Sequence, residues 1–196
     1  MQDFPLYFQL GWQHIADLSA YDHILFITVL CAVYLLNDWK KVLILVTAFT
    51  VGHSITLALS VLHIIQIPTP LIEFLIPVTI CITALANISR RDNQPEKLRL
   101  NYFFALFFGL VHGLGFSNYL KSLLGSQTSI WQPLMAFNIG LEFGQILIVA
   151  VVLLLGGIIV NLTGVKRRDW NMFISSAIFG IAIMMAIGRF EDLVKA

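Results

Sequence analysis

Long apolar runs separated by short polar breaks constrain this chain more than any other feature of its sequence. A membrane-crossing helix needs about 20 mostly apolar residues. Six segments come close to this length: 20–36, 41–63, 69–89, 101–119, 133–158 and 170–188. Only 12% of the residues are charged, about half the share of an ordinary globular domain. The sequence predicts an all-α protein, a polytopic bundle of six transmembrane helices that forms one domain over residues 1–196.

Residues 1–19 leave two arrangements open. The stretch GWQHIADLSAY is only mildly polar, so the first helix could begin at Gly11 and cross the bilayer at a tilt. Alternatively, residues 1–19 form an interfacial segment that ends in a turn at Ser19. An N-terminal surface or re-entrant helix of this kind would raise the number of segments from six to seven.

Basic residues gather in alternate breaks between the apolar segments. Nine Lys and Arg residues fall in three breaks, 37–41, 89–99 and 165–169. The two intervening breaks hold only Lys121. The positive-inside rule therefore predicts that the three basic breaks face the cytoplasm and that both termini lie outside. The net charge of +1 and the lack of a long basic run give no reason to expect nucleic acid as a partner.

Ionisable side chains within the apolar segments are the second unusual feature, because such residues are rare in membranes and usually functional. The candidates for a metal site are His14, Asp22, His23, His53, His112 and Glu142, with Glu73, Asn87, Asn138 and Gln145 as supporting residues. Taken singly, a histidine on an apolar helix is more often a hydrogen-bonded packing residue.

The depths of these residues argue against independent packing. At 1.5 Å per residue, His53 lies about 15 Å, His112 about 10 Å and Glu142 about 14 Å inward from the outer ends of their helices. Glu73 lies shallower, about 6 Å in. Independent packing residues would have no reason to share a level, so we expect several helices to contribute to one site in the outer half of the bundle.

The segment FNIGLEFGQ places Asn138, Glu142 and Gln145 on one helix face. A buried carboxylate needs a cation or a proton, and no Lys or Arg lies within the six segments away from their ends. The compensating charge is therefore expected to be a histidinium, a bound proton or a metal ion.

Glycines flank the two deep histidines. Gly52 precedes His53, and three glycines surround His112 in FFGLVHGLGF. Because glycine lowers helix propensity, this density predicts close backbone packing or a bent helix at His112. Close packing is what bringing ligands from separate helices to one ion requires.

Imidazole and carboxylate side chains are typical ligands of divalent transition metals, here Ni, Zn, Co or Cu. In the arrangement that we consider first, His23 binds the ion while Asp22 is a further ligand or orients a neighbouring imidazole. Neutral histidine beside a carboxylate is also compatible with a proton relay alone, and the residues themselves leave that alternative open.

Five segments in the same order resemble the HupE/UreJ family of bacterial membrane proteins, in particular its second subgroup. They are GWQHIADLSAYDHILF, FTVGHSITLAL, IEFLIP…ALAN, FFGLVHGLGFSNYL and FNIGLEFGQ. The resemblance implies a multi-pass protein of the bacterial inner membrane that is associated with nickel supply to hydrogenase and urease. His14, Asp22 and His23 match the family's first-helix positions, and the later matching positions are His53, His112, Asn138 and Glu142.

Three functions are compatible with these observations. The first is a transition-metal permease, nickel foremost, in which His14 and the Asp22–His23 pair capture the ion from outside. His53, His112 and Glu142 would then hold it at depth. Asn87 is the clear candidate for a path toward the inner side.

The second function is a zinc-type intramembrane hydrolase that acts on a lipid or membrane-peptide substrate. In that case Glu142 or Glu73 would be the general base, and Ser54 would polarise a carbonyl. The third is a metal or redox sensor or an accessory subunit. Glycine-rich helix faces would also permit a homo-oligomer.

Overall fold

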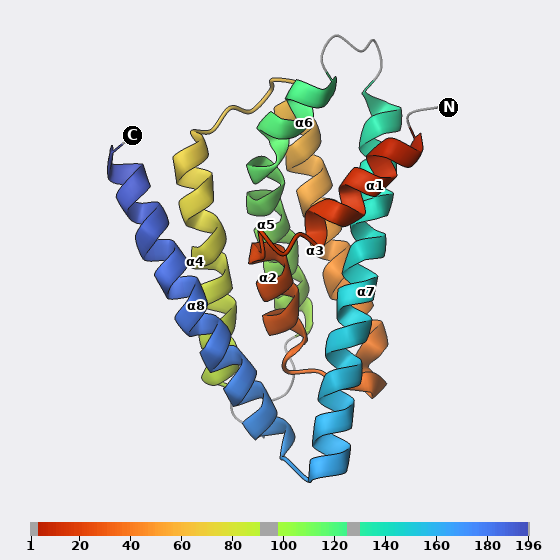
Figure 1. Cartoon of the computed structure of the whole chain (residues 1–196), viewed down its shortest axis with the longest axis vertical. Coiled ribbons are helices and arrows are strands. Elements are labelled where there is room, and N and C mark those ends of the chain that lie inside the picture. The colour runs from red at the N-terminus through yellow and green to blue at the C-terminus, as the bar shows by residue number, and fades with distance from the viewer. Residues whose placement is uncertain (1–3, 91–97, 125–129, 196) are drawn as a thin grey trace.

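The structure is a computed structural model that describes residues 4–90, 98–124 and 130–195. These residues form eight α helices and one short 3-10 helix, and no strand occurs among them (Figure 1). The helices are α1 (Phe4–Ile15), α2 (Asp22–Cys31), α3 (Trp39–Val61), α4 (Thr69–Ile88), α5 (Leu98–Gly115), α6 (Ser117–Leu124), α7 (Trp131–Thr163) and α8 (Arg167–Lys195), with η1 (Leu36–Asp38) before α3. The predicted all-α bundle is confirmed.

Four spans within the described residues are long and apolar enough to cross a membrane. They are Leu36–Val61, Thr69–Ile88, Trp131–Thr163 and Arg167–Lys195. Large apolar side chains on α7 and α8 face outward, such as Leu154 and Phe173, which are 50% and 70% exposed. An outer surface of this kind suits lipid rather than water.

Helices α5 and α6 are apolar and long enough to count as a fifth span only when taken together, over Asn101–Gly115 and Ser117–Leu123, and they meet at a bend of 48°. The bend lies one turn beyond His112, so the bent helix expected near this histidine is present. It directs α6 across the end of the bundle where the N-terminus also lies (Figure 1).

Helix α1 and the turn after it match the second arrangement left open for residues 1–19, a short helix that ends in a turn near Ser19, whereas α2 is shorter than the span expected over residues 20–36. Helix α2 has 10 residues and is about 15 Å long, which is too short for a hydrocarbon core of about 30 Å. In the break, the Asp17 carboxylate accepts a 2.8 Å hydrogen bond from the backbone N–H of Ser19, a local turn that competes with helix. Helix α1 runs obliquely from one end of the bundle, and α2 continues from near its middle (Figure 1).

Side chains from distant helices satisfy the buried C-terminal end of α2. Broken helices persist inside a membrane protein only where such groups find partners. Asn87 of α4 donates a 2.7 Å hydrogen bond to the Val29 carbonyl, and Arg167 of α8 donates a 3.0 Å bond to the Val33 carbonyl. Asn171 of α8 in turn donates to the Asn87 carbonyl at 3.0 Å. The break is therefore stabilised by tertiary contacts.

Glycines allow two helix pairs to approach at backbone distance. A Cβ atom on Gly52, Gly109 or Gly113 would overlap a backbone carbonyl oxygen across the α3–α5 contact. The same is true of Gly11 and Gly140 across the α1–α7 contact. The close packing predicted from the glycines is confirmed, and it holds the histidine-bearing helices together.

Both chain termini lie at the same end of the bundle, together with α6 (Figure 1). The α7–α8 turn, the start of α3 and the end of α4 lie at the opposite end. Two of the basic breaks, 37–41 and 165–169, are therefore at one end, and part of the third, 91–97, lies outside the described residues. Which end faces the cytoplasm stays a prediction from charge.

Candidate metal centre

Four histidines from four helices converge inside the bundle. His14 of α1, His23 of α2 and His53 of α3 each present a ring nitrogen, and these three atoms lie within 4.8 Å of one another. The ring centroid of His112 on α5 is 5.3 Å from that of His23. His23, His53 and His112 are fully buried, whereas His14 is half-buried.

The break between α1 and α2 brings the first two histidines together. Nine residues along a continuous helix would separate His14 from His23 by about 13 Å. In the structure their ring centroids are 4.6 Å apart, because His14 ends one short helix and His23 begins the next. His23 thus lies beside His53, which is eight residues before the end of α3.

The α3–α5 contact positions the other two histidines. Gly113, which follows His112, lies so close to the His53 carbonyl that a Cβ atom would overlap it. His53 and His112 therefore reach the same point from two helices that are in backbone contact.

Two hydrogen bonds orient the imidazoles. Nδ1 of His23 lies 3.1 Å from Oδ1 of Asp22, and Nδ1 of His112 lies 2.8 Å from the Phe108 carbonyl oxygen. A carboxylate and a carbonyl can only accept, so Nδ1 carries the proton in both rings and donates it. In the neutral ring, Nε2 then presents a lone pair, which is how metal-binding histidines are commonly held.

The remaining ring nitrogens are buried without partners. Within the described part of the chain, Nε2 of His14, His23 and His112 and both ring nitrogens of His53 have no hydrogen bond. An unsatisfied buried polar group costs about 1–3 kcal/mol, and five such atoms in one place are exceptional. A divalent transition metal would accept several of these lone pairs at once, so the residues present fit such an ion.

Phenylalanines enclose the four imidazoles. The Phe116 ring lies 4.0 Å from that of His14 and 4.9 Å from Phe137, both measured between centroids. Phe26 and Phe49 approach His112 at 5.2 and 5.1 Å. Apolar rings around the imidazoles lower the local dielectric constant, which strengthens interactions between an ion and its ligands. These phenylalanines could not be singled out from the sequence, since aromatic residues occur throughout the spans.

A second polar group lies between α3 and α7. Thr47 donates a 2.6 Å hydrogen bond to Oε1 of Glu142, and Thr50 donates a 2.8 Å bond to Oε1 of Gln145. Oε2 of Glu142, Oδ1 of Asn138 and Nε2 of Gln145 are buried and have no partner among the described residues. Glu142 is not a member of the three-histidine group, so its carboxylate forms a neighbouring polar site.

Thr47 and Thr50 were missed by the sequence analysis. Thr50 lies one turn before His53, whereas Thr47 is six residues away and is rotated by about 120° from it. The spacing of Thr50 from His53 was a readable signal, but threonine is common in apolar helices and can bond to its own backbone.

The structure does not bring Glu73 and Asn87 to the histidines. Oε2 of Glu73 accepts a 2.8 Å hydrogen bond from Nη1 of Arg189 on α8, and both side chains are partly exposed. The expectation of a histidinium, a proton or a metal ion concerned buried carboxylates, whereas the partly exposed Glu73 is paired with Arg189, which lies just beyond the segment predicted to end at residue 188. Asn87 bonds to the end of α2, and Ser54 donates to the Thr50 carbonyl of its own helix.

A family model described as HupE / UreJ protein matches residues 1–190. The chain belongs to the HupE/UreJ family. The match includes all four converging histidines and the polar residues of α7. No curated protein and no solved structure matches the chain. Membership of the HupE/UreJ family implies metal handling, and the structure contains a cluster of histidines that could hold a metal ion.

Proposed function

We propose that this HupE/UreJ protein is a permease for a divalent transition metal, nickel foremost, and that the four-histidine centre is where its cargo binds. The observation that carries this proposal is the convergence of unpartnered, buried ring nitrogens from α1, α2, α3 and α5. Packing alone would leave these atoms unsatisfied, whereas a cation with imidazole ligands satisfies them. The same donors would also accept Co²⁺, Zn²⁺ or Cu²⁺.

A polar face on α3 supports passage across the bundle. Thr50, His53, Thr56 and Ser60 follow one another at intervals of three or four residues and lie within about 120° of one side of the helix. The stretch from Thr50 to Ser60 covers about 15 Å. Such a stripe in an apolar helix provides oxygen and nitrogen ligands on both sides of the centre, as a route for an ion requires.

The interrupted first span also favours transport. Many transporters bind ions at helices that are broken inside the membrane, because the break exposes ligands and lets two half-helices move. Here the break is the feature that brings His14 and His23 together. A stabilising metal in a fixed bundle would not need it.

The centre lies nearer the end that carries both termini. His53 is eight residues, about 12 Å, from the end of α3 at Val61 and about 21 Å from its start at Trp39. If the basic breaks face the cytoplasm, as the positive-inside rule predicts, the ion enters from outside and leaves past Thr50 and Thr47. A bacterial inner-membrane location fits this direction.

The hydrolase alternative finds less support. Its candidate base Glu73 is paired with Arg189, and the Ser54 hydroxyl is committed to a backbone carbonyl. Glu142 would remain as the base, but its Oε1 accepts a hydrogen bond from Thr47, and its carboxylate is not among the ligand atoms that converge at the histidines. Transport makes use of more of the observed geometry.

Purified protein in detergent, loaded with Ni²⁺ and analysed by elemental mass spectrometry, tests the proposal. Wild type should hold metal at a fixed stoichiometry, the His53→Ala/His112→Ala double variant should lose it, and Asp169→Ala, which removes an exposed carboxylate from the α7–α8 region, should keep it. Reconstituted wild type should then admit Ni²⁺ into liposomes. Equal metal content in wild type and the double variant would contradict the assignment.

A further inference from the structure

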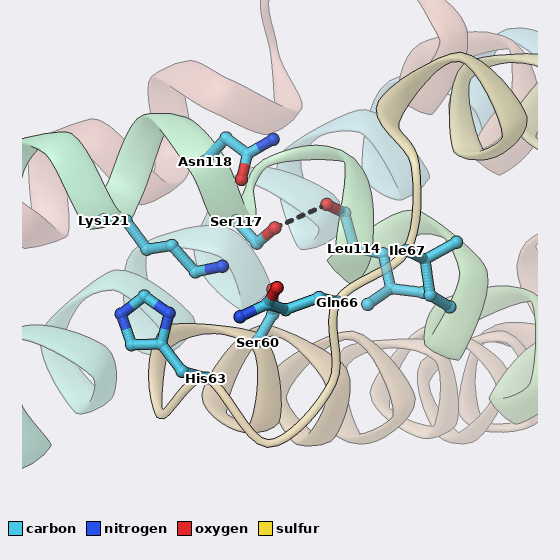
Figure 2. A pocket seen from close by; sticks show the side chains of 8 residues that line it. All are labelled: Ser60, His63, Gln66, Ile67, Leu114, Ser117, Asn118 and Lys121. Carbon is cyan, nitrogen blue, oxygen red and sulfur yellow. Dashed lines mark hydrogen bonds between the residues drawn. The ribbon is translucent and has the colours of Figure 1, made fainter.

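A polar pocket of about 370 Å³ opens at the end of the bundle that carries α6 (Figure 2). It lies between the end of α3, the loop that follows and the α5–α6 bend. Its polar lining consists of Ser60, His63, Gln66, Ser117, Asn118 and Lys121. This volume is at the lower end of the range for small-molecule sites.

The charge of the pocket is unusual for the mouth of a cation pathway. Its lining holds an ammonium, an imidazole, amides and hydroxyls, and no carboxylate. The Lys121 side chain points into the pocket beside Ser60 and Gln66 (Figure 2). Among the described residues, no ion pair includes Lys121. A bare divalent cation would be repelled here.

Two lining residues already have partners, which identifies the groups that remain for a ligand. The Ser117 hydroxyl donates to the Leu114 carbonyl at 2.8 Å, and the Asn118 amide donates to Oγ1 of Thr69 at 2.9 Å. These bonds hold α6 against its neighbours. The Lys121 ammonium and the side chains of His63, Gln66 and Ser60 are left as donors, and donors of this kind suit a carboxylate.

His63 is held in a conformation that non-glycine residues seldom adopt. Its φ is 59°, and no other non-glycine residue in the described ranges has a positive φ. The position follows the end of α3, where glycine is usual. Strained residues cluster at binding sites, and this conformation places the imidazole at the mouth of the pocket beside Lys121 (Figure 2).

The floor of the pocket lies above the histidine centre. Ser60 and Ser117 are 3% and 4% exposed, and Thr56 follows one turn deeper on the same face of α3. Ser60 and His53 are seven residues apart, about 10 Å along the helix. A ligand in the pocket would therefore sit at the start of the polar face that leads to the centre.

We propose that this pocket binds a carboxylate of a small organic acid that escorts the metal, so that the protein receives its cargo as an anionic chelate. This inference rests on the proposed transport function. Lys121 and His63 hold the escorting anion, and the cation exchanges its carboxylate oxygens for the imidazole nitrogens below. The rings bind in their neutral form and the acid leaves as its carboxylate, so the exchange transfers no proton and no electron.

Calorimetric titration of the purified protein with metal-free citrate tests the pocket. Citrate should bind wild type, and Lys121→Gln should weaken the affinity about tenfold, as expected for the loss of a hydrogen bond from a charged group. Lys121→Arg should restore most of the affinity. The matched control Lys166→Gln, at the opposite end of the bundle, should bind as wild type does.

Inorganic phosphate serves as the second probe. Phosphate binding as tight as citrate binding would overturn the assignment to a carboxylate, and equal citrate affinity in wild type and Lys121→Gln would overturn the pocket itself. Uptake into liposomes then tests whether the metal is delivered as a chelate. Lys121→Gln should slow entry of nickel citrate about tenfold more than entry of nickel chloride, because one charged hydrogen bond to the citrate is lost. Equal slowing would contradict it.

The outcomes separate the two proposals. Lys121→Gln should keep the wild-type stoichiometry of Ni²⁺ supplied as the chloride, because it leaves the four histidines intact. If Ni²⁺ still binds but citrate does not, the proposal that the pocket binds an organic acid is refuted and the transport function is not. If citrate binds but Ni²⁺ does not, the transport function is refuted, and so is the proposal that the metal arrives bound to an organic acid.

Discussion

Oδ1 of Asp22 lies 3.1 Å from Nδ1 of His23, the next residue in the chain, and the pair begins a helix in the middle of the bundle. The same oxygen accepts a 2.9 Å hydrogen bond from the His23 backbone N–H. A carboxylate at the start of a helix is favoured by the helix dipole. Asp22 therefore lies in the first turn of α2 and directs Nε2 of His23 toward the other imidazoles.

Replacing Asp22 by Ala should weaken metal binding without removing a ligand. Loss of a carboxylate that orients a metal-binding histidine typically reduces affinity 10- to 100-fold, so about that decrease is expected. Titration of Ni²⁺ into purified protein measures it. Asp17→Asn, in the exposed turn six residues from His23, keeps an oxygen for Ser19 and should bind Ni²⁺ normally. An unchanged affinity in Asp22→Ala would exclude the orienting role.

Replacing Gly113 by Ala should separate α3 from α5. The added methyl group would overlap the His53 carbonyl, and overpacking of this kind costs about 1–3 kcal/mol. Both the melting temperature in detergent and the Ni²⁺ affinity should fall. Gly180→Ala is the matched control, since nothing lies within 4 Å of its Cβ position, and its melting temperature should stay level or rise with helix propensity. Equal effects at the two sites would contradict the close contact.

Replacing Asn87 by Ala should lower stability more than metal affinity. The change leaves the Val29 carbonyl at the end of α2 without its side-chain donor, a loss of about 1–3 kcal/mol. Thermal unfolding measures this, and Asn161→Ala, at an exposed position near the end of α7, should have little effect. A normal melting temperature with a blocked uptake rate would instead make Asn87 part of the ion path.

Replacing Glu142 by Gln should separate binding from passage. The variant keeps an oxygen for Thr47 and leaves the four histidines in place, so Ni²⁺ stoichiometry should equal that of wild type. Uptake into liposomes should fall about tenfold, because an intramembrane carboxylate next to the route would be lost. Thr47→Val, which removes only the donor, should have a smaller effect. Loss of bound Ni²⁺ in Glu142→Gln would assign its carboxylate to the centre itself.

Hydrophobic periodicity and length predicted most of the fold because a membrane helix satisfies its own backbone within one segment. The spans expected at 41–63, 69–89, 133–158 and 170–188 correspond to α3, α4, α7 and α8. The first span could not be predicted in this way. Its interruption depends on a local turn at Asp17 and on bonds from Asn87 and Arg167, which are distant in sequence.

Part of the candidate site could be predicted from the sequence for the same reason. Depth along regular helices predicted that His53 and His112 share a level, and this holds. The partners of the two glutamates could not be predicted. Thr47 reaches Glu142 because of how α3 and α7 are rotated, and Arg189 reaches Glu73 because α8 extends beyond residue 188. The number of residues between two positions gives neither the rotation of a helix nor the point at which α8 ends.

The two halves of the broken span are attached to different neighbours. Helix α1 is in backbone contact with α7 through Gly11 and Gly140, whereas the far end of α2 is bonded to α4 and α8 through Asn87 and Arg167. His14 and His23 are therefore held by partly different contacts, although α2 also packs against α7, while His53 and His112 are joined by the α3–α5 contact. If α7 slid against α4 and α8, the distance between His14 and His23 would increase, whereas the distance between His53 and His112 would stay the same. An ion held by all four would then lose half its ligands in one movement, which is a means of unloading a tightly held ion.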